Sequence, residues 1–208
     1  MQFRIQYISN LHLCGKAAFP LLVKPAAKYL ALAGNIGKPG TAIHTSFIDY
    51  CTRHWEHVFY VPGSLEYPHI DLLEEEHNRN PRLSLLYYNQ MAHFLSKEHV
   101  AVVGMPFMDS VTHRKQLNNL IDYWDYQKAP VCVITHTNPT KLYTHMFRPP
   151  IKAWIYGYTT TRESDIYGTM YVAANGALNG KSACIDFTGG DDSGDKPLQE
   201  LAAFTMLA

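Results

Sequence analysis

Short apolar runs that stop abruptly at glycine, proline or asparagine limit the fold of this chain more than any other feature of its sequence. Phe3, Ile5 and Tyr7 alternate with polar residues and lead into Ser9 and Asn10, which is the pattern of a β-strand followed by a loop. Similar runs predict strands at residues 29–33, 57–61, 82–87, 91–95, 99–105, 130–136, 153–156, 169–173 and 183–187. A chain with so many short strands must form one or more β-sheets.

Three segments between these runs carry apolar residues at helical spacing. They cover residues 41–55, 70–79 and 112–127. The last of them has a stripe formed by Leu117, Leu120, Ile121 and Trp124. Interleaved strands and helices predict an α/β protein with a mixed sheet or sheets, whose outer faces are covered by helices.

The length of 208 residues suits a single domain. We expect residues 1–187 to form it, followed by an acidic, glycine-rich hinge and a short C-terminal segment over residues 188–208. The hinge, 189–195, lacks the later glutamate of a calcium-binding loop, so we interpret it as a solvated turn. Residues 198–207 have helical character, and we expect them to pack on their own domain, with an exposed partner-binding tail as the alternative.

Charge and cysteine content narrow the functional classes. Lys and Arg number 18, as do Asp and Glu, so no net field attracts nucleic acid or anionic lipid, while near-zero charge makes homo-oligomers possible. No apolar run approaches the ~20 residues that span a bilayer, and the N-terminus lacks a signal-peptide core. Cys14, Cys51, Cys132 and Cys184 show no CxxC spacing. We therefore expect a soluble, intracellular protein in a reducing compartment, with Cys132 and Cys184 buried as small apolar side chains.

Five of the expected strands end in polar or glycine-containing blocks, and strand ends are where open α/β sheets place their sites. The blocks at residues 10–12, 34–35, 63–66, 136 and 157–160 read NLH, GN, GSLE, H and GYTT. Their order and spacing resemble the calcineurin-like metallophosphoesterase family, in which they read DxH, GD, GNH followed by D or E, H and GHxH. The flanking segments YVPGSLEY and VITHTNPT are also similar to that family's YVxGNHEY and VxTHHxPT. The resemblance covers about residues 2–187.

The resemblance implies a two-sheet β-sandwich flanked by helices, an αββα four-layer arrangement, with a two-metal site across the strand ends. In intact members of the family, seven side chains hold the ions: two aspartates, one asparagine and four histidines. One aspartate bridges both ions, and a metal-held hydroxide attacks phosphorus. The histidine that follows the asparagine helps to protonate the leaving oxygen.

Matched residue by residue, this chain looks like a degenerate member of that family, with most metal ligands replaced. Asparagines stand for both aspartates, a serine for the asparagine, a leucine for the acid catalyst, and a tyrosine and a threonine for the last two histidines. Neutral amides bring no negative charge, so we expect no dinuclear centre, no metal, no cofactor and no catalytic residue. The vestigial metal-site and pocket positions are Asn10, His12, Asn35, Ser64, Leu65, His136, Tyr158 and Thr160.

Simpler roles for these residues are also open. Asn10 and Asn35 are interpreted as turn residues that bond nearby backbone amides, and His12 and His136 as hydrogen-bonded structural histidines. Glu66 is expected to cap the helix that starts near residue 68. A rewired mononuclear site would combine His12 and His136 with a local carboxylate or His69.

The sequence therefore predicts a catalytically inactive metallophosphoesterase-fold protein, a pseudoenzyme, retained as a structural or protein-binding module whose partner is another protein. One alternative is a divergent, mononuclear phosphoesterase. Another is a metal-free binder that holds a small phosphate or nucleotide in a neutral polar cleft. Several tyrosines could anchor an interface: Tyr87, Tyr88, Tyr123, Tyr126, Tyr143, Tyr156 and Tyr158.

Overall fold

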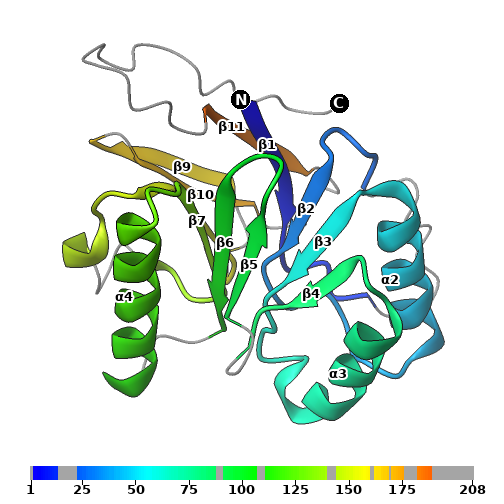
Figure 1. Cartoon of the computed structure of the whole chain (residues 1–208). Coiled ribbons are helices and arrows are strands. Elements are labelled where there is room, and N and C mark those ends of the chain that lie inside the picture. Colours follow the sequence, from blue (N-terminus) through cyan, green and yellow to red (C-terminus); the bar gives the residue numbers. More distant parts are fainter. Residues whose placement is uncertain are drawn as a thin grey trace.

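Two β-sheets pack face to face in the computed structural model of the chain. The structure describes residues 2–13, 23–87, 91–106, 111–139, 144–159, 162–168, 170–175 and 182–188. The first sheet has the strand order β11-β1-β2-β3-β4, and the second has the order β5-β6-β7-β8-β10-β9. Figure 1 shows both sheets in the middle of the molecule.

The first sheet is parallel except at one edge, where β11 pairs antiparallel with β1. Its strands are β1 (Gln2–Ile8), β2 (Tyr29–Leu32), β3 (His57–Tyr60), β4 (Leu83–Leu85) and β11 (Ala183–Thr188). The second sheet is parallel from β6 to β10 and has antiparallel strands, β5 and β9, at its two edges. Its strands are β5 (Ala92–Leu95), β6 (Val100–Met105), β7 (Val131–Thr135), β8 (Ile151–Tyr156), β9 (Arg162–Tyr167) and β10 (Met170–Asn175).

Within the described residues, three α-helices cover the outer faces of the sheets. Figure 1 shows α2 (Ala42–His54) and α3 (Ile70–Arg79) beside the first sheet, and α4 (Val111–Tyr126) on the opposite side of the molecule, beside the second. The part of the chain that the structure describes also contains the short 3-10 helices η1 (Tyr67–His69) and η3 (Thr144–Met146). The expected four-layer αββα arrangement is therefore confirmed.

The pattern of apolar residues explains why these layers form. In β1 the alternating Phe3, Ile5 and Tyr7 face the second sheet, where they join an apolar core between the sheets. Every residue of β7 is buried, as expected for a parallel strand that is covered on both faces. In α4, Leu117 and Ile121 pack against the outer face of the second sheet. Each sheet is thus apolar on both faces and needs a second covering layer.

The predicted helices lie within one residue of the observed ones at each end, but one strand was not predicted. This strand, β9, has the polar sequence RESDIY and lies at a sheet edge, where Ile166 is 58% exposed. Cys132 and Cys184 are buried, as predicted, and so is Cys51. The hinge and C-terminal segment, 189–208, lie outside the described residues. None of the helices in the described ranges is long and apolar enough to span a membrane.

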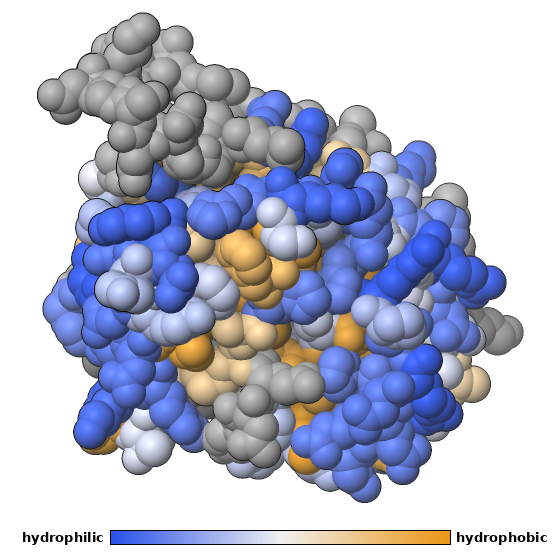
Figure 2. Space-filling view, in the orientation of Figure 1, coloured by the Kyte–Doolittle hydropathy of each residue, from blue (hydrophilic) through white to orange (hydrophobic). Residues whose placement is uncertain are grey.

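Hydrophobic side chains gather in one area of the face seen in Figure 2. Figure 2 shows this area at the centre, where β5 and β6 lie in Figure 1, surrounded by hydrophilic residues. Phe94 of β5 is 39% exposed and stacks on Trp124 of α4. Of the tyrosines expected as interface anchors, Tyr123, Tyr126 and Tyr158 are exposed, Tyr87 is half-buried, Tyr156 is buried, and Tyr88 and Tyr143 lie outside the described residues.

Candidate functional site

His136 joins the two sheets at the ends of their parallel strands. It follows β7 of the second sheet, is almost fully buried, and donates from Nδ1 to the carbonyl oxygen of Ala33, just after β2 of the first sheet, at 3.0 Å. A carbonyl can only accept, so this bond fixes the proton on Nδ1. Burial lowers the pKa of His136, although the Ala33 bond and the Glu66 charge act in the opposite direction. The neutral imidazole is therefore a structural link between the sheets.

Three glycines make room for the His136 ring. A Cβ at Gly63 would lie 2.9 Å from His136 Cε1, and one at Gly157 would lie 2.9 Å from His136 Nδ1. Gly34, whose φ of 83° lies in the left-handed region, also abuts the ring. These glycines belong to three of the strand-end blocks, so the blocks close around one imidazole.

Asn35 connects the block after β2 to the block after β3. Its Oδ1 accepts a hydrogen bond from Ser64 Oγ at 3.0 Å and another from the backbone N–H of Leu65 at 3.2 Å. The side chain of Asn35 is nearly buried, and its φ of 56° is one that asparagine tolerates. Asn35 stands where the family resemblance implies an aspartate that bridges two ions, and its side-chain oxygen is instead used in internal hydrogen bonds. Its backbone-amide donor, Leu65, is distant in sequence, whereas a nearby donor was predicted.

The block after β1 lies beside the block after β2. The backbone N–H of Asn10 donates to Gly34 O, and that of His12 donates to Asn35 O, each at 3.0 Å. Asn10 Nδ2 also donates to the carbonyl of Thr159, which links this block to the one after β8. Asn10 is nearly buried, whereas the side chain of His12 is exposed. Asn10 therefore links the loops after β1, β2 and β8 by hydrogen bonds.

Exposed apolar side chains surround the strand ends. Tyr158 is 70% exposed and packs edge-to-face on the His136 ring with centroids 5.6 Å apart. Leu65 is 38% exposed and Tyr67 is 42% exposed. Thr160, the remaining predicted site residue, lies outside the described residues. The rim of the site is thus aromatic and aliphatic where the family resemblance implies histidines.

Glu66 does not cap a helix, so that prediction was wrong. It precedes η1, but its side chain makes no capping bond there. Its buried carboxylate instead accepts hydrogen bonds from the backbone N–H groups of Asn35, Ile36, Gly37 and Gly63, at 3.0, 2.7, 3.1 and 2.7 Å. The carboxylate finds more donors in the two neighbouring strand-end loops than a helix terminus would offer, and it holds those loops together.

A chain of buried polar groups continues behind Glu66. Tyr60 Oη donates to Glu66 at 3.0 Å and lies 3.2 Å from His44 Nε2, and His44 Nδ1 lies 3.2 Å from Glu76 Oε2. Thr45 Oγ1 also donates to Glu76, at 2.8 Å. Burial alone would raise the pKa of Glu76, but His44, Thr45 and Arg79 together lower it below its ordinary value. No motif pointed to this chain, because its members come from separate elements and only Glu66 belongs to a strand-end block.

These side chains do not fit a pair of divalent cations. Leu65 has no donor atom, Asn35 Oδ1 already accepts two hydrogen bonds, and the only imidazoles among the predicted positions are His12 and His136. Asn10 Oδ1 is buried and accepts no bond from the described residues, but a single neutral oxygen does not offset two double charges. Within the described ranges, no three or more His, Cys, Asp or Glu side chains are grouped to hold a metal ion, so the rewired set with His69 is not assembled there.

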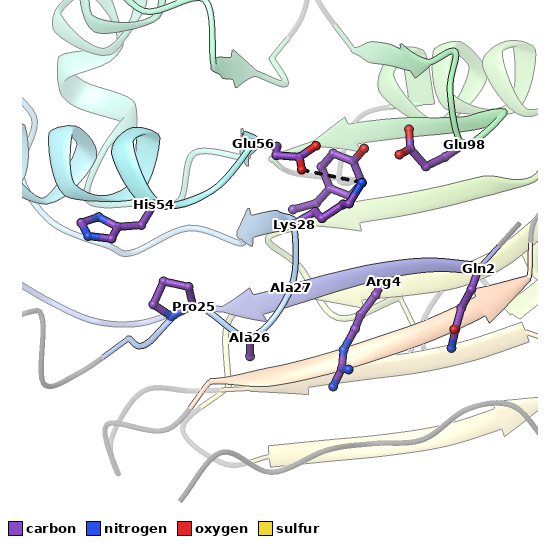
Figure 3. Close-up of a pocket in the computed structure, with 10 residues that line it drawn as sticks. Gln2, Arg4, Pro25, Ala26, Ala27, Lys28, His54, Glu56 and Glu98 are labelled. Carbon is purple, nitrogen blue, oxygen red and sulfur yellow. Dashed lines mark ion pairs between the residues drawn. The ribbon is translucent and has the colours of Figure 1, made fainter.

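A separate cavity of about 710 Å³ lies near the starts of β1 and β2, away from the strand ends. Figure 3 shows the Lys28–Glu56 ion pair on one side and Arg4 and Gln2 projecting from β1 on the other. The Lys28 and Glu56 charges are 3.6 Å apart, and Arg4 lies 3.3 Å from Asp186, which is outside the lining. Because Arg4 and Lys28 are paired with carboxylates, the electrostatic potential in the cavity is not dominated by one sign of charge.

Solved structures with the same fold support this description. A phosphopantetheinyl hydrolase from Mycobacterium tuberculosis has a TM-score of 0.55 and 11% identity, over 84% of this chain and 90% of its own. A protein described as a 5′-nucleotidase from Staphylococcus aureus has a TM-score of 0.63 and 9% identity, over 100% of this chain and 53% of its own.

GAP50 of Plasmodium has a TM-score of 0.55 and 11% identity, over 90% of this chain and 81% of its own. No protein-family model and no curated protein matches the sequence. Identities this low show a common fold and leave the chemistry to the site itself. The chain has the metallophosphoesterase fold.

Proposed function

We propose that this protein is a metallophosphoesterase-fold pseudoenzyme that binds another protein and does not hydrolyse phosphate esters. The observation that carries the proposal is the bonding of Asn35. Its Oδ1 accepts from Ser64 Oγ and Leu65 N, at the position where the family resemblance implies an aspartate shared by two ions.

Electrostatics support the loss of hydrolysis. A metal-held hydroxide forms near neutral pH because the ions lower the pKa of bound water, and a close pair of ions needs anionic ligands to offset its charge. Asn10 and Asn35 supply none. The carboxylate within the strand-end blocks is that of Glu66, which is buried and accepts from four backbone N–H groups. Leu65, at the acid-catalyst position, has no proton to donate.

The exposed rim supports a protein-binding role. Tyr158, Leu65 and Tyr67 present aromatic and aliphatic surface around a site that has no charged side chain in the predicted positions. Partly exposed aromatic residues are typical anchors of protein interfaces. GAP50, which has the same fold, is described as the anchor in the inner membrane complex, so an anchoring role of this fold has a precedent.

A hydrolysis assay tests the catalytic part of the proposal. Untagged full-length protein is incubated with Mn²⁺ and an aryl phosphate monoester or diester, with and without chelator. We expect no turnover above the buffer rate. Chelator-sensitive turnover that is also lost in His12→Asn would contradict the proposal, because His12 is exposed and its φ of 47° suits asparagine. Turnover that is equal in both proteins is expected from a contaminating phosphatase.

A matched pair of surface variants tests the binding part. Tyr158→Asn with Leu65→Ser removes the apolar rim, whereas Tyr126→Asn removes an exposed tyrosine at the C-terminal end of α4, which precedes the start of β7 and does not belong to a strand-end block. Affinity purification from the source cells should recover partners with the wild type and with Tyr126→Asn that the rim variant loses. Recovery of the same partners by all three proteins would place binding elsewhere.

A further inference from the structure

A second polar cluster lies where the edges of the two sheets meet, and the strand-end site does not use it. His57 begins β3, Ser84 is in the middle of β4, and His93 is in β5. His57 shares a face of β3 with Phe59, and His93 pairs in register with Val102. Phe59 and Val102 both belong to the core between the sheets. Two imidazoles therefore occupy inward-facing positions that apolar residues normally fill.

Each of the two imidazoles directs one ring nitrogen at the same atom, Ser84 Oγ. His57 Nε2 lies 2.7 Å from Ser84 Oγ, and His93 Nδ1 lies 2.9 Å from the same oxygen. The rings themselves are 4.3 Å apart between centroids. Since a hydroxyl donates a single proton, Ser84 donates to at most one of these nitrogens and accepts an N–H from the other; a tautomer shift that moves this proton to the far ring nitrogen leaves both lone pairs directed at the same point. Converging imidazole nitrogens are what a transition-metal ion requires.

The surroundings favour neutral imidazoles. Burial, followed by the charges of His93 and His77, lowers the pKa of His57 to about 4, and burial lowers the pKa of His93. Both rings are then unprotonated at neutral pH, as metal ligation demands. They line a cavity of about 290 Å³, large enough for an ion with its water ligands, and none of the described residues that line it is a carboxylate.

We propose that His57 and His93 form a chelating pair for a divalent transition-metal ion, with water and the Ser84 hydroxyl completing the coordination. His77 lines the same cavity, but its Nδ1 donates to Leu83 O at 2.6 Å, and the pair does not depend on it. The ligand softness selects Cu²⁺, Zn²⁺ or Ni²⁺ over Mg²⁺ and Ca²⁺, which prefer oxygen ligands. The bound ion would pin the first sheet to the second, because its ligands belong to β3 and β5 (Figure 1).

Titration calorimetry on untagged, chelator-treated protein at pH 7.5 tests the proposal. We expect saturable binding of one equivalent of Zn²⁺ or Cu²⁺ and none of Mg²⁺. His57→Ala and His93→Ala should each weaken binding at least about tenfold. His99→Asn is the matched control, because His99 is exposed, contacts Phe94 rather than the pair, and has a φ of 52° that asparagine accepts. It should bind like the wild type.

Thermal unfolding provides a second readout that does not need the alanine variants to fold well. An ion at 100 times its Kd should raise the Tm of the wild type by about 5 to 10 °C, and Mg²⁺ should leave it unchanged. The proposal fails if the wild type binds neither Zn²⁺ nor Cu²⁺ saturably, or if both alanine variants bind as the wild type does. It also fails if His12→Asn abolishes binding, since the ion would then sit at the strand ends.

Discussion

The carboxylate of Glu66 lies 3.0 Å from the hydroxyl of Tyr60, and both side chains are fully buried. Burial, followed by the Glu66 charge and hydrogen bond, raises the pKa of Tyr60, so the phenol keeps its proton and donates it. Together with four backbone N–H groups, this donor satisfies the carboxylate. The loops after β2 and β3 are therefore held in place by a protein anion, and their geometry does not depend on bound ions.

Glu66→Gln should strongly destabilise the protein. The new amide nitrogen would face backbone N–H donors, leaving buried groups unsatisfied, and we expect a loss of about 3 to 5 kcal/mol in the free energy of unfolding. Denaturant titration measures this loss. Glu75→Gln is the matched control, because that side chain is exposed, and it should change the free energy by less than about 0.5 kcal/mol. Equal stabilities of the two variants would show that Glu66 does not hold the loops.

Gly157→Ala should also be severely destabilising. Its Cβ would overlap the carbonyl oxygen of Ala33 and lie 2.9 Å from His136 Nδ1, so the bond between the sheets could not form as it does. Gly168→Ala is the comparison, because its φ of 62° is strained for alanine but no atom lies within 4 Å. We expect Gly168→Ala to cost about 1 kcal/mol and Gly157→Ala several times more. Similar melting temperatures would contradict the packing described around His136.

The free energy of unfolding should fall on mild acidification, because burial disfavours the protonated forms of His57 and His93. The pKa of His57 is about 4 in the folded protein against an ordinary 6.5, so below pH 6.5 the unfolded chain binds the proton more readily. The stabilisation from the neutral His57 ring is fully present above pH 6.5. As the pH falls toward 4, the free energy of unfolding decreases by on the order of 1 to 2 kcal/mol, after allowance for solvent screening. His93, whose pKa is also lowered, adds in the same direction.

Urea unfolding at pH 7.5 and pH 5.0, with chelator present, measures this dependence. The midpoint should be lower at pH 5.0 in the wild type, and the difference should shrink in His57→Ala. His99→Asn should keep the wild-type difference. A midpoint that is the same at both pH values would show that these imidazoles accept protons without cost in the folded state.

The buried thiols should be inert in the folded protein. Burial raises the pKa of Cys51 and of Cys132, and Cys184 is also buried. In a Cys14→Ser variant, we expect no reaction with a thiol reagent under native conditions and three reactive thiols after unfolding, since the thiolate is the reacting form. Rapid labelling of the native variant would indicate that the core opens.

Most of the fold could be predicted because its strands and helices carry apolar residues at the matching spacing. The strand β9 could not be predicted, since RESDIY contains a single aliphatic residue. This segment forms a strand because it pairs with β10. The family resemblance predicted the two-sheet arrangement, and the solved structures confirm it. The division into residues 1–187 and 188–208 stays a prediction.

The candidate site was harder to predict than the fold. The strand-end blocks indicated which residues would meet, and the structure does bring Asn10, Asn35, Ser64 and His136 to adjoining loops. The partners of these residues were not predictable. Apart from the Ser64 hydroxyl, which donates to Asn35, the acceptors and donors, such as Ala33 O for His136, are backbone groups, and backbone groups leave no signature in a sequence. The same reason explains the error over Glu66.

The pairing of β1 with β11 has a consequence for how the chain folds during synthesis. Residues 2–7 pair with residues 183–188, so β1 is synthesised long before one of its two neighbours in the sheet. Until that neighbour leaves the ribosome, one edge of β1 offers unsatisfied N–H and C=O groups to any extended segment nearby. Nascent copies on one messenger are therefore at risk of exchanging strands, and a chaperone that shields this edge would raise the yield of correctly folded protein.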